Sequence, residues 1–442
     1  MLSNGGVCLR KLAGRRSREV QFGRWLANPR VTPAKVIEPA LRRTGQLAAG
    51  RHVLAIQDTT EINYQAHAKR VRGLGTVGNG VDAGLFLHPL LALDAADGSC
   101  LGLAHVHHWN RDRQATPSAR KLRIEDKESF RWLDTAQAGK QVLSQAAQIT
   151  IIADRESDIY EEWARLPDAR THLLTRACHD RRLAPTSLDT ESAKLYPWLA
   201  GLPVQGSYSF NVPARPGKRS AHTARLEIRF GRTAIQRPAS CTDKHAPSHI
   251  ELYAIEVKEL PESVVGKERP IHWRLLTTHA IASVEDALQC VGWYRQRWHI
   301  EQLFRTLKRQ GLNIESSQVE TADGLVKLIH LAIQVAVRTM QLTLAREGEG
   351  AGTAQAADVF EPHELEVLRQ LKPTLEGKTL KQKNPHPDGS LAQAAWVIAR
   401  LGGWKGYASE AKPGPITMHD GLRQLAAMCA GWRLAWKNVC ID

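Results

Sequence analysis

The sequence lacks the cysteine patterns that build disulfide scaffolds or zinc sites. Its seven cysteines are scattered through 442 residues, are odd in number and include no C-x-x-C pair. Disulfide-rich domains and zinc modules depend on clustered cysteines at regular spacings. We therefore expect neither a disulfide framework nor a zinc site, and this cysteine usage fits a reducing cytoplasm.

The chain also lacks a secretory leader, an uninterrupted membrane-spanning run and an internal repeat. No apolar segment of the kind that forms the core of a secretory signal opens the sequence. The longest apolar stretch, residues 325–344, is interrupted by Lys327, His330, Gln334 and Arg338. Because a membrane span needs about 20 predominantly apolar residues, this stretch predicts an amphipathic core helix. We expect a cytoplasmic protein without a membrane partner.

Positive charge is what the chain has in excess. Its net charge is +15, its pI is about 9.6, and residues 1–50 hold ten Lys or Arg against two Glu. The length suffices for about two or three domains. The charge favours an anionic partner, most simply nucleic acid, although a role at a ribosome or a membrane surface fits the charge alone equally well. The basic N-terminal segment on its own is also typical of a disordered leader.

Two apolar runs each end in an aspartate. Residues 53–56 predict a buried strand with Asp58 just past it, and residues 149–153 predict a second with Asp154 at its end. Asp158 is a plausible cap for a following helix. Taken singly, an aspartate after a strand is more often a turn or cap residue than a functional one.

The rest of the chain predicts a mixed architecture. Further strands are expected at 86–93, 101–106, 226–230, 252–257 and 273–277, and residues 120–147 are expected to be helical. Alternation of apolar and polar residues from about residue 200 predicts an antiparallel β insertion with an exposed basic loop at 213–220. A glycine-rich stretch after residue 346 predicts a linker to a smaller helical domain.

The stretch from Trp293 to Gly311 concentrates polar chemistry on one predicted helical face. Tyr294, Arg297, Glu301 and Lys308 fall at offsets of zero, three, seven and fourteen, within about 60° of arc at ~100° per residue. An acid among cations suits a metal ligand that also holds phosphate nearby. The alternative is a solvated helix in which Glu301 simply pairs with Arg297 or Arg305.

Asp58, Asp154 and Glu301 together form a candidate metal-binding set. Carboxylate oxygens suit hard divalent cations such as Mg²⁺. Two such ions, about 3.5–4 Å apart, activate a water or 3′-hydroxyl and stabilise the leaving oxygen of a phosphodiester. Neighbouring cationic side chains would stabilise charge on the transferring phosphoryl group.

The order D-T-T at 58–60, D-R-E-S-D at 154–158 and the spaced tetrad resembles the bacterial DDE transposases of the insertion-sequence-four family. Similar segments continue at residues 24–31, 125–129, 272–278 and 389–404. The resemblance implies an α/β fold: an RNase H-like mixed-sheet core interrupted by an antiparallel β insertion at about 182–270, followed by a C-terminal helical domain.

This resemblance also implies a reaction and a site. Asp58, Asp154 and Glu301 would be the catalytic and metal-binding triad, holding two Mg²⁺ ions for which Mn²⁺ may substitute. The enzyme would nick a transposon end, form and reopen a hairpin, and join the 3′ ends to target DNA. Its partners would be double-stranded DNA, at terminal inverted repeats and target sites, and a second copy of itself in the DNA complex. It would act in the bacterial cytoplasm, at the nucleoid.

The implied DNA contacts extend beyond the triad. They are Tyr294, Arg297, Lys308, Trp273, Arg176 and Trp298. Trp273 matches a family tryptophan that stacks on a flipped base, although a core aromatic is an equally good interpretation of that residue. Two residues after Arg176 the family carries a lysine, where this chain has Cys178.

The chain departs from the family near its N-terminus, because Asp58 comes about forty residues too early. We expect residues 1–45 to be a remnant of a DNA-binding domain, 46–346 the catalytic domain and 347–442 a helical dimerisation domain. Three functions stay open: an active transposase, a truncated regulator that dimerises with the full-length enzyme, and an RNase H-like nuclease without strand transfer.

Overall fold

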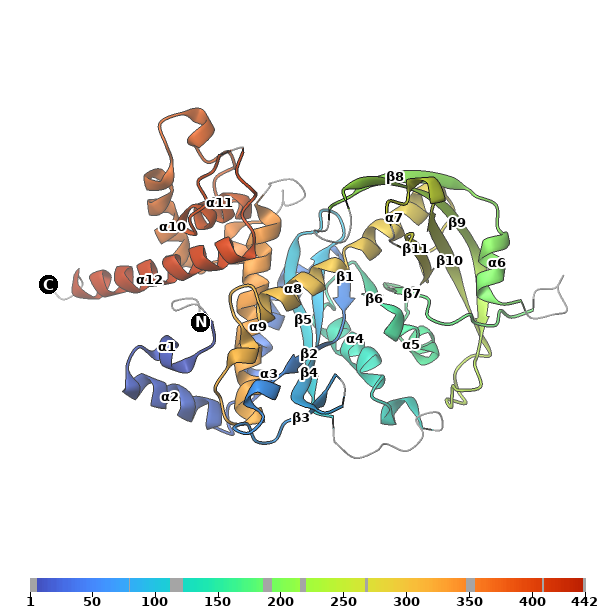
Figure 1. The fold of residues 1–442 in the computed structure, drawn as a ribbon, viewed down its shortest axis with the longest axis horizontal. Coiled ribbons are helices and arrows are strands. Elements are labelled where there is room, and N and C mark those ends of the chain that lie inside the picture. The colour runs from blue at the N-terminus through green and yellow to red at the C-terminus, as the bar shows by residue number, and fades with distance from the viewer. Residues whose placement is uncertain are drawn as a thin grey trace.

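The computed structural model describes residues 6–78, 80–111, 122–185, 193–214, 220–266, 269–346, 354–407 and 409–439. Most of the predicted basic loop at 213–220 and of the predicted linker after residue 346 lies outside these ranges. The described residues form a mixed sheet covered by helices, with a separate group of helices at the C-terminal end (Figure 1).

The strands belong to one 11-stranded sheet with the order β2-β4-β1-β6-β7-β11-β10-β9-β8, to which β3 and β5 add through β4. Its parallel centre is β1, β6 and β7. The strands are β1 (His52–Gln57), β2 (Thr60–Asn63), β3 (Gly75–Val77), β4 (Asp82–Asp94), β5 (Cys100–Trp109), β6 (Gln148–Ala153), β7 (Thr171–Arg176), β8 (Gly206–Val212), β9 (His222–Gln236), β10 (His249–Glu259) and β11 (His272–Thr277). All the predicted strands are present.

The predicted β insertion extends the central sheet. Strand β11 pairs antiparallel with β7, with Leu275 opposite Arg176, and β10, β9 and β8 follow in turn. The antiparallel strands therefore continue the edge of the parallel core, and the segment after β11 returns to the centre of the sheet.

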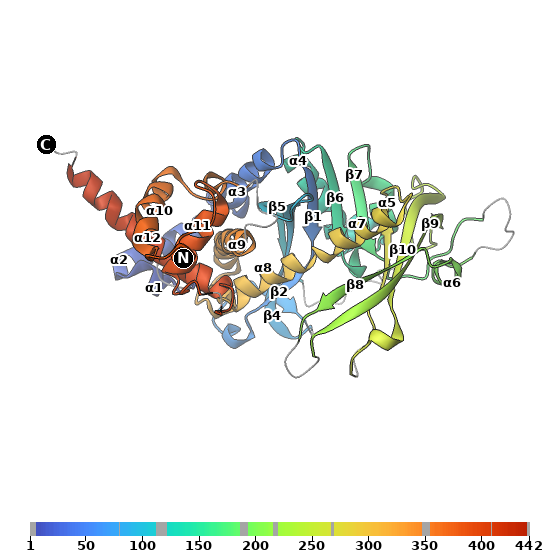
Figure 2. The ribbon, with the colours of Figure 1, turned by 90° about the horizontal axis from the view of Figure 1, so that it is seen from above.

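Helices cover both faces of the sheet, which explains why the central strands are almost continuously apolar. Odd-numbered residues of β1 and β6, such as Val53 and Ile151, pack towards α4 (Phe130–Val142), α5 (Tyr160–Arg165) and α6 (Leu195–Gly201). Even-numbered ones, such as Ile56 and Ile152, pack towards α7 (Val284–Arg295), α8 (Trp298–Lys308) and α9 (Ala322–Ala345). Figure 2 shows α7 and α8 following one another across the strands towards α9.

Two local predictions are wrong. The helix expected over 120–147 is confined to α4, and a single 3₁₀ turn at Ile124–Asp126 precedes it. Asp158 does not cap α5, which begins at Tyr160. Its carboxylate instead accepts hydrogen bonds from Arg181 and from the backbone N–H groups of residues 178 and 179, because the turn after β6 directs it towards the end of β7.

The basic N-terminal segment is helical, so the alternative of a disordered leader is wrong for residues 9–47. It forms α1 (Leu9–Ala13), α2 (Arg16–Ala27) and α3 (Pro33–Leu47), and α2 and α3 pack on α9. The buried Lys327 of α9 donates to the carbonyl oxygens of Leu26 and Asn28, at 2.9 and 3.1 Å, and pairs with Asp323. One ammonium group thus satisfies carbonyls at the end of α2 and ties the N-terminal helices to the core.

Helix α9 is long and apolar enough to cross a membrane by length and composition alone. In its most apolar 18-residue stretch, 67% is buried inside the protein. The core helix of a soluble protein can have the same length and composition. Its packing against α3, α8 and β5 matches the core helix predicted for residues 325–344.

The C-terminal helices have a core of their own. Helices α10 (Pro362–Leu375), α11 (Leu391–Leu401) and α12 (Pro415–Val439) pack together and against the end of α9, through Leu342 and Ala345. Figure 1 shows α12 extending away from the sheet towards the C-terminus.

Replacing Lys327 with Met should destabilise the protein. The apolar side chain fits the buried site but leaves the Leu26 carbonyl without the ammonium donor, while the Asn28 carbonyl keeps only its bond from the Val31 N–H. We expect the free energy of unfolding to fall by about 1–3 kcal/mol, measured by urea denaturation. Lys69→Met, at an exposed position, is the matched control, and an equal effect of both changes would contradict the role given to Lys327.

Candidate functional site

Two aspartates lie side by side at the ends of neighbouring parallel strands. Ile56 of β1 pairs in register with Ile152 of β6. Asp58 and Asp154 each follow two residues later, so the same register places them next to each other. Side chains two positions apart along a strand share a face. The two aspartates therefore lie on the same face as Ile56 and Ile152, whose side chains pack beneath α7 and α8.

Backbone contacts hold both carboxylates. Asp58 accepts a hydrogen bond from the N–H of Thr59 at 2.8 Å. Asp154 caps the 3₁₀ turn at Arg155–Ser157 by accepting from the N–H of Glu156, also at 2.8 Å. Each side chain is therefore oriented by the turn that ends its own strand.

The predicted helix from Trp293 to Gly311 is two helices, which corrects the sequence interpretation. Helix α7 ends at Arg295, α8 runs from Trp298 to Lys308, and a tight turn joins them. In that turn the N–H of Arg297 donates to the carbonyl of Tyr294 at 3.1 Å. Side chains three residues apart eclipse in such i→i+3 geometry, so Tyr294 and Arg297 stay on one face despite the break.

Arg297 connects Glu301 to the sheet. Its Nη1 lies 2.9 Å from Asp58 Oδ2 and its Nη2 lies 3.0 Å from Glu301 Oε1, with 14% of the side chain exposed. The pairing of Glu301 with Arg297 that a plain charged helix predicts is thus present. The same guanidinium also binds Asp58, so the pairing brings helix and strand together.

The pKa of Asp58 shows how close the acidic groups are. Burial raises the pKa of this carboxyl to about 7, and the negative charges of Asp154 and Glu301 add to the shift, while Arg297 and the Thr59 N–H oppose it. Three carboxylates that repel one another in this way are suited to a divalent cation. Within the described ranges, no three His, Cys, Asp or Glu side chains already form a metal site. Asp58, Asp154 and Glu301 nevertheless offer the oxygen donors that Mg²⁺ prefers.

Tyr294, Trp273 and Arg176 gather beside these carboxylates. The ring of the buried Tyr294 meets that of Trp273 edge-on, with centroids 5.8 Å apart. Arg176 ends β7 and donates to the carbonyl of His272 at 3.0 Å. Burial raises the pKa of Tyr294, and the charge of Arg176 acts against that shift. The half-buried Trp273 is therefore both a packing residue and part of the site's wall.

Lys308 and Trp298 differ in how accessible their side chains are to a ligand. The Lys308 ammonium donates to the carbonyl of Glu61 at 2.8 Å and lies 3.4 Å from Glu315, so it ties α8 to β2. Trp298 is 53% exposed, and the Arg297 guanidinium lies 5.7 Å from its ring centroid. Trp298 is the more accessible of the two to a ligand.

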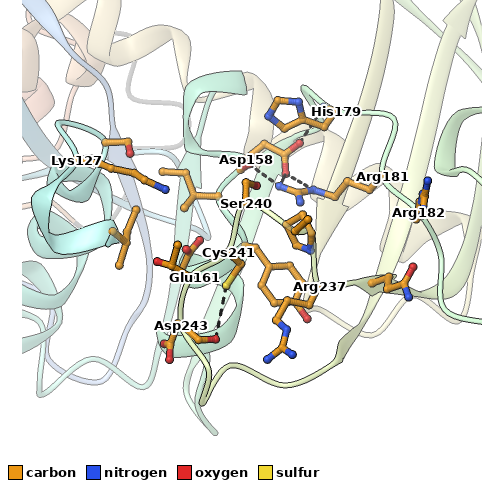
Figure 3. A pocket seen from close by; sticks show the side chains of 18 of the residues that line it. Lys127, Asp158, Glu161, His179, Arg181, Arg182, Arg237, Ser240, Cys241 and Asp243 are labelled. Carbon is orange, nitrogen blue, oxygen red and sulfur yellow. Dashed lines mark hydrogen bonds and ion pairs between the residues drawn. The ribbon is translucent and has the colours of Figure 1, made fainter. Parts of the chain in front are cut away.

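A cavity of about 940 Å³ lies near the turn after β6 but does not include the acidic triad (Figure 3). Asp158 and Arg181 form a buried ion pair in its wall, and Glu161 and Cys241, which also line it, lie below them in Figure 3. Its lining mixes acidic and basic side chains in similar numbers. The cavity is therefore distinct from the carboxylate cluster.

Sequence reasoning missed Arg131 and Glu162, which contact neighbours of both aspartates. No motif marks either residue. The available signals were weak: Arg131 lies two residues after the E-D-K-E-S segment, and Glu162 is one of two adjacent acids in α5.

Residues 134–337 match the transposase DDE domain. This match supports a transposase, an enzyme of DNA cleavage and transposition. Asp154, Tyr294, Arg297, Glu301 and Lys308 lie within the matched segment, and Asp58 precedes it. The mixed sheet flanked by helices is consistent with an RNase H-like transposase core followed by a helical region, and the predicted fold class is confirmed.

Replacing Arg297 with Met should make the protein more responsive to divalent cations. Without the guanidinium, the repulsion among the three carboxylates is uncompensated. We expect a lower melting temperature without metal and a larger rise on adding Mg²⁺ than in wild type, measured by calorimetry. Arg305→Met, exposed on the next turn of α8, should behave as wild type; equal Mg²⁺ responses of the two variants would refute the arrangement.

Proposed function

We propose that the protein is a metal-dependent DDE transposase that cleaves DNA at transposon ends and joins the freed 3′ ends to target DNA. The observation that carries the proposal is that Arg297 joins Asp58 to Glu301 while Asp154 lies beside Asp58, in a chain of which residues 134–337 match the transposase DDE domain. We further propose membership of the insertion-sequence-four family, with motifs that resemble those of the transposon Tn-five enzyme.

The triad would hold two Mg²⁺ ions, or Mn²⁺ in their place, which supply activation of a water or 3′-hydroxyl and stabilisation of the leaving oxygen. The chain's own residues set the conditions for that chemistry. The turns after β1 and β6 orient Asp58 and Asp154. Arg297 keeps Glu301 against the sheet and places a positive charge where a phosphate would approach.

DNA contacts surround this centre in the proposal. Tyr294, Arg297, Arg176 and Lys308 would contact phosphates, and Trp273 and Trp298 would contact bases. The exposure of Trp298 supports a stacking role, whereas Trp273 offers only the part of its ring that Tyr294 leaves free. The net charge of +15 supports a polyanionic partner.

The domain roles are proposed on the same basis. Residues 1–45 would be a remnant of an end-recognition domain, 46–346 the catalytic domain and 347–442 the dimerisation domain. The exposed Met428 and Leu434 on α12 support a contact with a second copy. The protein would act at the nucleoid in the bacterial cytoplasm.

Glu301→Gln should abolish Mg²⁺-dependent cleavage while leaving DNA binding nearly unchanged. Because losing a group that only orients a metal ligand costs about 10–100-fold, we expect losing a ligand to cost more than about 100-fold. The assay is single-turnover cleavage of labelled DNA carrying the element's terminal repeats, with binding followed by gel shift. Glu320→Gln, at an exposed position outside the site, is the control; near wild-type cleavage by Glu301→Gln would remove Glu301 from the triad.

Trp298→Ala and Arg176→Ala should weaken DNA binding in different ways. Loss of a stacked ring costs about 1–3 kcal/mol and leaves the salt dependence unchanged. Loss of one phosphate contact lowers the slope of log affinity against log salt by about one. Fluorescence anisotropy over a salt series separates them, and identical slopes for both variants and wild type would contradict the phosphate contact of Arg176.

A further inference from the structure

Side chains on the sheet face opposite α8 join the turns that carry the two aspartates. Gln57 and Thr59 flank Asp58, and Glu156 and Ser157 follow Asp154. None of these four side chains belongs to the proposed triad. All four are nevertheless linked to one another through α4, α5 and β4.

The first link is Glu162 of α5. Its Oε1 accepts from Gln57 Nε2 at 3.2 Å and its Oε2 lies at hydrogen-bond distance from Ser157 Oγ, 2.6 Å away. Glu162 is 1% exposed, so water does not substitute for either partner. One buried carboxyl group therefore spans both turns.

The second link is Arg131 of α4. Its Nε donates to Thr59 Oγ1 at 3.1 Å and its Nη2 donates to Glu156 Oε2 at 2.8 Å. The guanidinium also lies over the rings of Trp109 and Trp132, with its central carbon 5.1 and 5.4 Å from their centroids. A planar group packed in this way has little freedom to follow a shift of either turn.

His88 of β4 closes the ring between the two links. Its Nδ1 lies 2.8 Å from Thr59 Oγ1 and its Nε2 lies 3.3 Å from Gln57 Oε1. Burial holds the pKa of His88 well below its usual range, so the imidazole is neutral. Gln57 donates its amide N–H to Glu162, so its Oε1 faces His88 and accepts from the Nε2–H; the Nδ1 is then unprotonated and accepts from the Thr59 hydroxyl.

The hydrogen bonds therefore run in one direction, from Arg131 through Thr59, His88 and Gln57 to Glu162. A guanidinium that only donates begins the chain, and a carboxyl that accepts ends it. Bonds aligned head to tail in a buried site strengthen one another. The chain and the two links together make a closed frame around the two turns.

We propose that Arg131 and Glu162 are positioning residues that set the placement of Asp58 relative to Asp154, and through it the affinity for divalent cations. This inference rests on the proposed function. Groups that orient metal ligands change metal affinity by about 10–100-fold when they are lost. A network that merely satisfied buried polar groups would need no member spanning both turns, yet Arg131 and Glu162 each do so.

Glu162→Met and Glu162→Gln test the first link. Met fills the volume but accepts from neither partner, whereas Gln accepts from Gln57 and donates to Ser157. Burial raises the pKa of Glu162 to about 8, so at neutral pH the carboxyl is mostly protonated. Its Oε2 hydroxyl then donates to Ser157 Oγ, as the amide of Gln would. We expect Mn²⁺ affinity of the full chain, measured by electron paramagnetic resonance without DNA, to fall about 10–100-fold for Met and to stay within about threefold of wild type for Gln.

Arg131→Met tests the second link. If Glu162→Met does not fold, this variant alone tests whether the positioning residues set the affinity for divalent cations. Its loss of Mn²⁺ affinity should match that of Glu162→Met. The controls are Arg338→Met and Glu364→Gln, an ion pair between α9 and α10 with a 2.6 Å separation, which should leave Mn²⁺ affinity unchanged.

The outcomes distinguish failure of the proposed metal-dependent function from failure of the positioning role of Arg131 and Glu162. Wild-type protein that binds no Mn²⁺ would overturn the proposed function. Wild-type binding with equal affinity in both Met variants would overturn only the positioning role. Equal losses in Glu162→Gln and Glu162→Met, or in the Arg338→Met control, would also overturn it, because packing or general loosening would then explain the effect.

Discussion

The parallel pairing of β1 with β6 is the constraint on which the site depends. Two aspartates about a hundred positions apart become neighbours only because Ile56 pairs with Ile152. A slip of one residue would turn one aspartate to the opposite face. The apolar residues of both strands prevent that slip, since each strand is buried on both sides. The packing of the core and the placement of the acidic groups are therefore set by the same register.

The two faces of this strand pair carry different parts of the machinery. On the α7 and α8 side lie the carboxylates and Arg297, where charge is concentrated and partly exposed. On the α4 and α5 side lie Glu162, His88 and Arg131, whose hydrogen bonds are buried at Glu162 and between His88 and Gln57, and partly buried between Arg131 and Thr59. The alternation of side chains along a strand makes this division possible. The exposed face is available to a ligand, while the buried face resists movement of the turns.

The sequence predicted what depends on short-range patterns. The apolar runs before Asp58 and Asp154 and the spacing of Tyr294, Arg297 and Glu301 were sufficient to expect the strands and the shared helical face. The turn that separates α7 from α8 contains no glycine or proline. Its residues continue the helical spacing of the sequence, so nothing in the pattern marks the break. The roles of Asp158 and Lys308 were not predictable, because their partners, Arg181 and the Glu61 carbonyl, come from other elements. The same is true of Arg131 and Glu162, whose links span up to 105 positions.

Among the described residues, the site holds three carboxylates but one guanidinium in direct contact with them, and this excess of acidic groups favours the metal-dependent chemistry proposed for it. Arg297 offsets one of three carboxylates and leaves two negative charges within a small, partly buried volume. Burial is the main cause of the raised pKa of Asp58, and the repulsion from Asp154 and Glu301 adds to it while Arg297 opposes it. A divalent cation carries the charge that this cluster lacks, whereas a monovalent cation does not. A second divalent cation would need further negative charge, which the phosphate of bound DNA supplies. Under the proposed function, the carboxylates would bind the first ion, and the DNA substrate would complete the site for the second.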